Sequence, residues 1–162
     1  MTHDIKKILC SVGMHGNCGN VLEQATNLAL ATGADLHVLH VAKPFSDDMV
    51  NTLKVNIQDR GFLDSLMEQR IDERRRELSE KIEAACSRHP PLQEAMKGHR
   101  VTQTVLEGYP ASVISHFSKR GDFDMIVMAA NRKSHIATYI GKVTKGVIKR
   151  AKVPVVVVPT TR

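Results

Sequence analysis

The residues best suited to binding chemistry lie in a basic loop near the C-terminal end of the sequence. The segment 124–162 starts with the apolar run DMIVMAA and finishes with VPVVVVPTTR, and Arg132, Lys133 and Lys142 lie between the two apolar runs. Lysine and arginine form charge-assisted hydrogen bonds with phosphate oxygens. If the runs are strands of a parallel sheet, this loop lies at the strand carboxyl ends, where ligands usually bind. The sequence therefore predicts an anion-binding loop.

Catalytic and metal-binding patterns are not recognisable in the same sequence. Ser11, Ser134 and Thr144 belong to no G-x-S-x-G motif and to no Ser-His-acid arrangement. His37 and His40 are three residues apart on an expected strand, so they point to opposite faces and cannot share a metal ion. We therefore expect a binding protein without catalytic residues or a metal site, and keep slow ATP hydrolysis as an alternative.

Alternating strand-like and helix-like patterns predict the elements that position this loop. Strands are expected at 7–12, 36–41, 100–106, 125–128 and 155–158, with helices between them at 20–33, 62–88 and 110–121 and around Val143, Val147 and Ile148. Such alternation is typical of an α/β, Rossmann-like parallel sheet with helices on both faces and right-handed crossovers. If strand one neighbours strand four, the loops after Val12 and Met128 meet in one crevice.

The length of 162 residues predicts one domain, residues 1–162, with a long extension at about 44–90. Residues 45–61 mix charges with isolated apolar residues, which predicts an irregular excursion with one short helix. The charged residues of 62–88, Arg70 and Arg74 among them, are expected on a solvated helix face. An extension of this length suggests a lid or an interface.

Charge and composition exclude several classes of protein. The net charge is +6, and the segment from Met125 onward holds eight Lys or Arg residues and no acid. Nucleic acid remains an unlikely partner because there is no tryptophan and no recognition motif. Lys142, Lys145, Lys149 and Lys152 predict one exposed helix face, with polyanion docking as the alternative.

Apolar runs and cysteines predict a cytoplasmic protein. No apolar window reaches the roughly 18 residues of a membrane span, and the N-terminal segment lacks the pattern of a signal peptide. Three cysteines without C-x-x-C spacing indicate reduced thiols, of which only Cys18 is expected to be exposed.

Four stretches, KKILCSV, GYPA, DMIVMAA and GKVTKGVIKRAKVPVVVV, resemble the universal stress protein family over essentially the whole chain. The resemblance implies a stress-response binding or signalling module with strand order 3-2-1-4-5. It also implies a homodimer paired through strand five, with Val155, Val156, Val157 and Val158 at the edge. The family contains members that bind ATP and members that do not, so a protein-interaction module with unidentified partners and no small ligand stays open.

Nucleotide-binding members of the family carry an aspartate after strand one and a G-x-x-G-x9-G-(S/T) pattern after strand four, and this chain departs from both. Gly13 stands at the aspartate position, Ala129 and Asn131 or Arg132 replace the first two glycines, and Lys142 follows the retained Gly141. The resemblance implies an adenine-nucleotide site, ATP being the leading ligand, with a degenerate phosphate loop and altered affinity. Its candidate residues are Val12, Gly13, Val41, Met128, Ala129, Asn131, Arg132, Gly141, Lys142, Val143 and Thr144.

Overall fold

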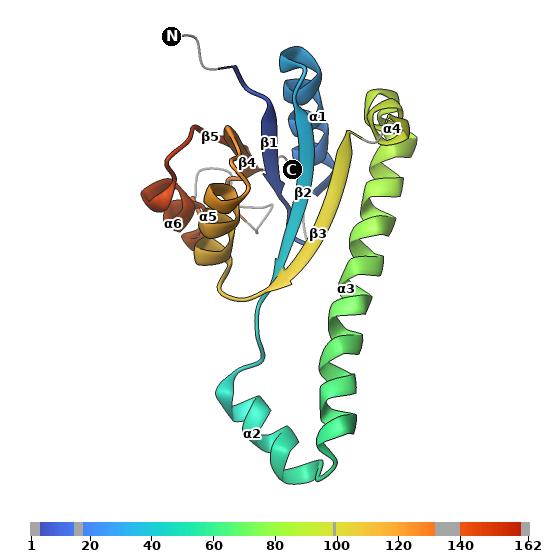
Figure 1. Cartoon of the computed structure of the whole chain (residues 1–162), viewed down its shortest axis with the longest axis vertical. Helices are drawn as coiled ribbons and strands as arrows, with labels where there is room; N and C mark the ends of the chain where they lie inside the picture. The colour runs from blue at the N-terminus through green and yellow to red at the C-terminus, as the bar shows by residue number, and fades with distance from the viewer. Residues whose placement is uncertain (1–3, 15–17, 99, 132–139, 160–162) are drawn as a thin grey trace.

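Five parallel strands form the centre of the protein in a computed structural model that describes residues 4–14, 18–98, 100–131 and 140–159. The strand order β3-β2-β1-β4-β5 is the order that the sequence resemblance implied (Figure 1). The strands are β1 (Lys7–Ser11), β2 (Asp35–Ala42), β3 (Val101–Glu107), β4 (Met125–Ala129) and β5 (Val155–Val158).

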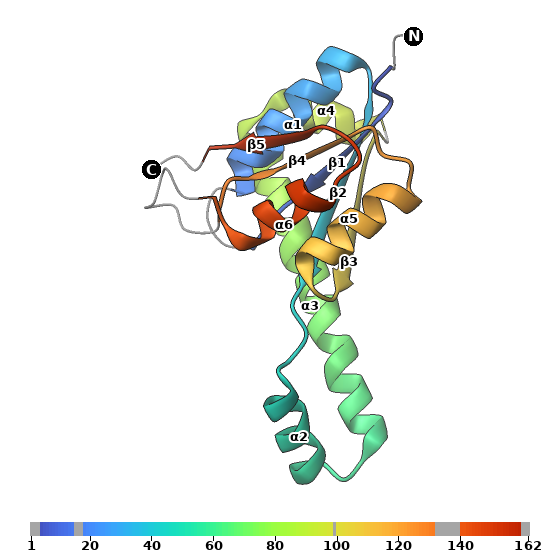
Figure 2. The ribbon, with the colours of Figure 1, turned by 90° about the vertical axis from the view of Figure 1, so that its left-hand side faces the viewer.

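Helices cover both faces of the sheet, as the uninterrupted apolar runs of its central strands require (Figures 1 and 2). One face carries α1 (Cys18–Thr32), the C-terminal half of α3 (Arg60–Arg88) and α4 (Pro90–Lys97), packed around Ile8, Cys10 and Val127. The other face carries α5 (Pro110–Arg120) and α6 (Lys142–Arg150), packed around Leu9 and Ile126. The predicted single α/β fold is therefore confirmed.

Hydrogen bonds at the amino ends of β1 and β4 align these two strands. The Asp124 carboxylate accepts hydrogen bonds from the backbone N–H groups of Lys6 and Lys7, at 2.9 and 3.0 Å. The resulting register pairs Leu9 with Ile126 and Ser11 with Met128. The chain therefore leaves β1 and β4 side by side, and the loops after these strands meet at one edge of the sheet.

Several helix boundaries differ from the sequence-based predictions. Helix α1 begins at Cys18 and not at the capping box that Asn20 suggested. Helix α4 was not predicted, because Pro90-Pro91 was interpreted only as the end of α3. Proline is also favoured in the first turn of a helix, where its missing N–H costs nothing. On α6, Ile148 was expected on the buried face but is 50% exposed.

The predicted extension contains α2 (Asp47–Asn56) and the N-terminal half of α3, and we call residues 47–69 the arm. Both views show the arm projecting beyond the sheet (Figures 1 and 2). Ser46 caps α2 and Asp59 caps α3, so each helix begins at a side chain that accepts backbone N–H bonds. Leu63 is the one buried residue among the described residues of the arm. The arm therefore adds little to the core.

The two strand histidines lie on opposite faces, as predicted. The ring of His37 lies tilted beside the ring of Phe117 on the α5 face, with 5.2 Å between the ring centroids. Its nitrogens lie 2.6 and 2.9 Å from the hydroxyls of Thr102 and Thr104. Burial, with a smaller contribution from the Lys7 ammonium, lowers the pKa of His37 below its ordinary value. His40 faces the other way, toward the end of β1.

The edge position of β5 leaves one side of that strand without a partner strand among the residues that the structure describes. Val155, Val156 and Val157 are half-buried, whereas Val158 is buried. Among the described helices, none combines the length and the apolar character needed to span a bilayer.

Candidate functional site

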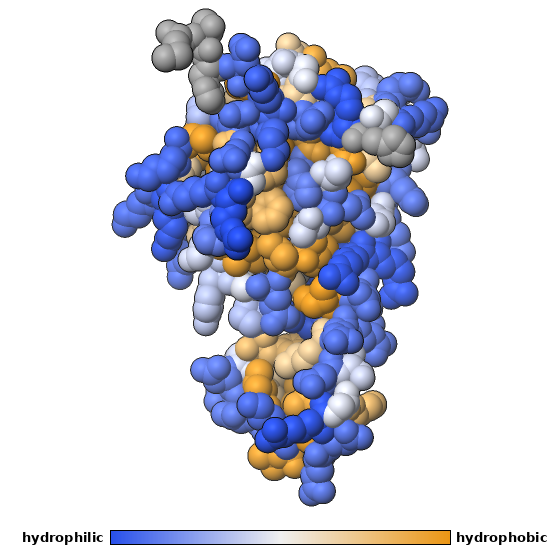
Figure 3. All heavy atoms as spheres, viewed as in Figure 1, coloured by the Kyte–Doolittle hydropathy of each residue, from blue (hydrophilic) through white to orange (hydrophobic). Residues whose placement is uncertain are grey.

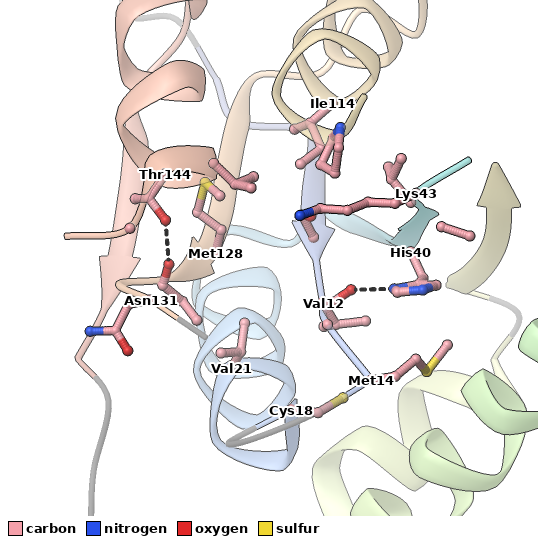
Figure 4. A pocket seen from close by; sticks show the side chains of 18 of the residues that line it. Val12, Met14, Cys18, Val21, His40, Lys43, Ile114, Met128, Asn131 and Thr144 are labelled. Carbon is pink, nitrogen blue, oxygen red and sulfur yellow. Dashed lines mark hydrogen bonds between the residues drawn. The ribbon is translucent and has the colours of Figure 1, made fainter. Parts of the chain in front are cut away.

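A pocket of about 480 Å³ opens at the carboxyl ends of β1, β2 and β4 (Figure 4). Its walls come from the ends of these strands and from α1, α3, α5 and α6. Such a position, outside the strand carboxyl ends of a parallel sheet, is where α/β proteins usually hold their ligands. The volume lies within the range of small-molecule sites.

The structure brings the sequence-predicted residues together around this pocket. Ten of the eleven candidates line it, and the eleventh, Arg132, lies outside the described residues. The ten are Val12, Gly13, Val41, Met128, Ala129, Asn131, Gly141, Lys142, Val143 and Thr144.

The start of α6 is held against the end of β4 by two hydrogen bonds. Gly141, the N-cap residue of α6, donates its N–H to the Ala130 carbonyl at 2.9 Å. One turn into the helix, the buried Thr144 hydroxyl donates to the Ala129 carbonyl at 2.8 Å. These bonds place the N-terminal end of α6 on the pocket, where the helix dipole favours an anion.

Gly141 leaves space beside the pocket without being required by the backbone. Its φ of −70° is accessible to any residue. A Cβ at this position would lie 3.4 Å from the Asn131 Cα, which is ordinary contact. The absence of a side chain therefore matters for how closely a ligand approaches the helix end, and not for the turn itself.

His40 fixes the opposite rim of the pocket. Its Nδ1 lies 2.8 Å from the Val12 carbonyl oxygen, and a carbonyl can only accept, so Nδ1 carries the hydrogen (Figure 4). The Val12 N–H in turn donates to the Leu39 carbonyl at 3.0 Å. The peptide at the end of β1 is thus held on both sides, and Gly13 follows it without a side chain.

Three cations that line the pocket were not among the predicted site residues. Lys43 directly follows β2, and its side chain extends across the pocket (Figure 4). Arg70 and Arg74 reach the pocket from α3, although the sequence pattern placed both on a solvated helix face. The position of Lys43 directly after a predicted strand could have indicated that it lines the pocket. No local sequence pattern indicates that α3, about 30 residues further on, brings Arg70 and Arg74 back to the sheet.

Arg70 connects the arm to the body of the protein. Its guanidinium forms an ion pair of 2.8 Å with Glu107 at the end of β3 and donates to the Lys43 carbonyl. The same group lies 4.2 Å from the centroid of the Phe45 ring. Three segments therefore converge on one side chain at the mouth of the pocket.

The charged side chains that line the pocket are all positive. Lys43, Arg70, Arg74 and Lys142 line it, and no aspartate or glutamate is among its described lining residues. Within the described part of the chain, no group of three or more His, Cys, Asp or Glu side chains is placed to hold a metal ion. This arrangement suits an anionic ligand held by cations, by backbone amides and by an apolar floor that includes Ile114 and Met128.

Cys18 also lines the pocket, but the expectation that it is exposed was wrong. The residue is only 6% exposed because the first turn of α1 packs against the end of the sheet. Burial raises the pKa of its thiol, and Lys81 and Arg88 offset part of this rise. Cys86 on α3 is the more accessible cysteine.

Comparison with models of known families identifies one family over nearly the whole chain. The family model described as the universal stress protein family matches residues 4–159. The comparison with curated proteins found no match.

Solved structures of universal stress proteins share the fold at low sequence identity. UspA from Lactobacillus plantarum is 18% identical, with a TM-score of 0.62, and the match covers 97% of this chain and 99% of that one. A universal stress protein in complex with cAMP is 15% identical, with a TM-score of 0.60 and coverage of 98% and 100%.

A third structure is a universal stress protein from Archaeoglobus fulgidus in complex with dAMP. It is 18% identical, with a TM-score of 0.57, and the match covers 96% of this chain and 98% of that one. The family model spans nearly the whole sequence, and the sheet order and the pocket at its carboxyl edge are consistent with that match. This chain belongs to the universal stress protein family.

Proposed function

We propose that this protein is a cytoplasmic, dimeric stress-response module that binds an adenine nucleotide in the pocket at the carboxyl ends of β1, β2 and β4. The observation that carries the proposal is that all charged residues lining this pocket are positive, with Lys142 at the start of α6 and no acid among the described lining residues. The complexes of two structural neighbours with cAMP and dAMP support the adenine nucleotide as the ligand class.

The departures from the nucleotide-binding pattern change how the phosphates would be held. Ala129 and Asn131 place side chains where glycine would let phosphates approach the backbone closely. Lys142 supplies a charge in exchange. A cation in the first turn of a helix opposes the helix dipole, so a bound phosphate relieves an unfavourable interaction as well as forming a new one. We expect nucleotide binding whose affinity depends on this lysine.

Isothermal titration calorimetry with ATP, ADP and AMP tests the proposal. We expect all three to bind, and the Lys142→Gln variant to bind ATP about tenfold more weakly, because one charge-assisted contact is lost. The Lys149→Gln variant is the matched control, since Lys149 is an exposed lysine of the same helix and does not line the pocket. No heat of binding at millimolar nucleotide would reject the function.

We propose pairing through β5 as the basis of the dimer. The carbonyls of Pro154 and Val158 accept from β4, so the alternating backbone groups of Val155 and Val157 face away from the sheet. The Val157→Pro variant removes one outward N–H, and we expect sedimentation velocity to show a shift to monomer. The Val157→Ala variant keeps the N–H and serves as the control, and a monomeric wild-type protein would contradict the proposal.

The arm supports a second candidate function, a protein-interaction module. On the face drawn in Figure 3, apolar surface gathers over the tip of the arm. Met49, Val55 and Phe62 are 48%, 77% and 54% exposed. We propose that residues 1–162 form one domain whose extension at about 44–90 contacts other proteins. Partner capture that is unchanged in a Val55→Ser, Phe62→Ser variant would count against this role.

A further inference from the structure

The cations of the pocket lie on two sides of β1. Lys142 begins α6, which follows β4, whereas Lys43 follows β2 and is accompanied by Arg70 and Arg74 from α3. Strand β1 lies between β2 and β4 in the sheet. Neighbouring strands are about 4.8 Å apart, so the ends of β2 and β4 are separated by about 10 Å. The pocket therefore presents positive charge at two separate ends.

The β2 end of the pocket contains Lys43, whose backbone is held in place. Arg70 donates to the Lys43 carbonyl and is itself held by Glu107, which fixes the backbone from which the Lys43 side chain extends. Among the ion pairs of the described residues, none includes Lys43 or Lys142. Each lysine brings its charge into the pocket without a carboxylate from this part of the chain beside it.

Arg74 adds donors to the same end. Its Nη1 atom binds both carboxylate oxygens of Glu77, at 2.8 and 2.9 Å, and Glu77 belongs to the same helix. This contact uses one guanidinium nitrogen, whereas arginine offers five N–H donors in a planar fork. Arg74 lines the pocket, whereas Glu77 does not. Arg74 can thus bind an anion in the pocket while it keeps Glu77.

We propose that Lys43 and Arg74 form a second anion subsite, so that the preferred ligand is a nucleotide phosphorylated at two separate positions of its ribose. This inference rests on the proposed nucleotide-binding function and specifies the ligand class of that site. One phosphate binds at Lys142 and the start of α6, and the other binds at Lys43 and Arg74. Arg70 is a positioning residue, because it acts through the Lys43 backbone.

Two isomeric ligands separate this inference from simple attraction between a basic protein and phosphate. ADP and adenosine 3′,5′-bisphosphate contain the same atoms, but ADP has both phosphates on the 5′ oxygen of the ribose, whereas the bisphosphate has one on the 5′ oxygen and one on the 3′ oxygen. We expect calorimetry to show the bisphosphate binding at least about tenfold more tightly than ADP, as one additional charge-assisted contact predicts.

Variants assign the preference to the subsite. Lys43→Gln and Arg74→Gln should each remove most of the preference for the bisphosphate over ADP. Lys43→Arg keeps the charge and should retain the preference. Lys149→Gln removes the same charge outside the pocket and should change neither ligand. Thermal unfolding of each variant checks that the fold is kept.

Each outcome of the titrations decides between the claims. Equal affinity for the two isomers, or tighter binding of ADP, would overturn the second subsite and leave the proposed nucleotide function intact. A preference that persists in both Lys43→Gln and Arg74→Gln would overturn it as well. Binding of neither isomer to the wild-type protein would reject the nucleotide function and the subsite together.

Discussion

The Arg70→Gln variant tests whether one side chain at the base of the arm attaches the arm to the body of the protein. Arg70 pairs with Glu107 at 2.8 Å, donates to the Lys43 carbonyl and lies over the Phe45 ring at 4.2 Å. The arm itself buries only Leu63 among its described residues. Because the arm buries so little apolar surface, these polar contacts should determine what fraction of molecules has the arm attached to the body of the protein.

The magnitude follows from the three contacts. The side chains of Arg70 and Glu107 are 18% and 38% exposed, so solvent screening leaves their ion pair about 0.5 kcal/mol. A hydrogen bond to a carbonyl contributes about 1 kcal/mol, and the cation–π contact about 0.5 kcal/mol. Loss of about 2 kcal/mol corresponds to roughly a 30-fold increase in the open population.

Hydrogen–deuterium exchange measures this opening directly. We expect arm amides between 47 and 69 to exchange up to about 30-fold faster in Arg70→Gln, while β1 and β4 keep their protection. Arg75→Gln is the matched control, because Arg75 pairs at 2.7 Å with Asp72 on the same helix and, among the described residues, forms no ion pair with another element. Equal exchange of the arm in the two variants would refute the role of Arg70.

Three further predictions concern stability and thiol chemistry. Gly121→Ala should destabilise the protein by about 1–3 kcal/mol, because the new Cβ would clash with the Phe123 ring, whose Cδ2 atom would lie 2.8 Å away. Gly98→Ala, at another helix end of similar backbone conformation, should change the unfolding midpoint in urea by little. Because the pKa of His37 is lower in the folded state, the unfolded state binds more protons, and the free energy of unfolding should fall as the pH drops below about 6.5. The His37→Gln variant should show a weaker dependence of the unfolding free energy on pH between about pH 5 and 7. The same pH dependence in the variant and the wild type would contradict this prediction. Burial raises the thiol pKa of all three cysteines; Glu83 raises that of Cys86 further, and Cys18 raises that of Cys10 further. Iodoacetamide should nevertheless label Cys86 first, because Cys86 is the most accessible of the three. Peptide mapping that found another cysteine labelled first in the folded protein would contradict the structure.

The sheet was predictable because its signals are local. The apolar runs at 125–128 and 155–158 had the length and β-branched composition of buried strands, and the structure has strands at both places. Patterning alone did not give the strand order, because the register between β1 and β4 depends on contacts such as the Asp124 carboxylate with the Lys6 and Lys7 amides. The family resemblance supplied that order.

Half of the pocket was predictable from the sequence and half was not. Residues at or just beyond the carboxyl ends of strands, such as Gly13 and Ala129, were found because parallel strands end at one edge of the sheet. Arg70 and Arg74 were missed because helical periodicity assigns polar residues to solvent and carries no information about a long helix crossing a pocket 30 residues later. The burial of Cys18 was missed for a related reason, since it depends on where α1 begins.

The chain leaves the sheet after β2 to form the arm and returns to β3 through the C-terminal half of α3 and through α4 (Figure 1). Both segments that connect the core to the arm therefore lie outside residues 47–69. Residues 57–59 between its two helices are a natural position for inserting a foreign domain or a fluorescent reporter. Loop-closure entropy grows only slowly with loop length, so such an insertion should cost the sheet little stability. A reporter there would move with the arm while the strands that hold the pocket stay in place.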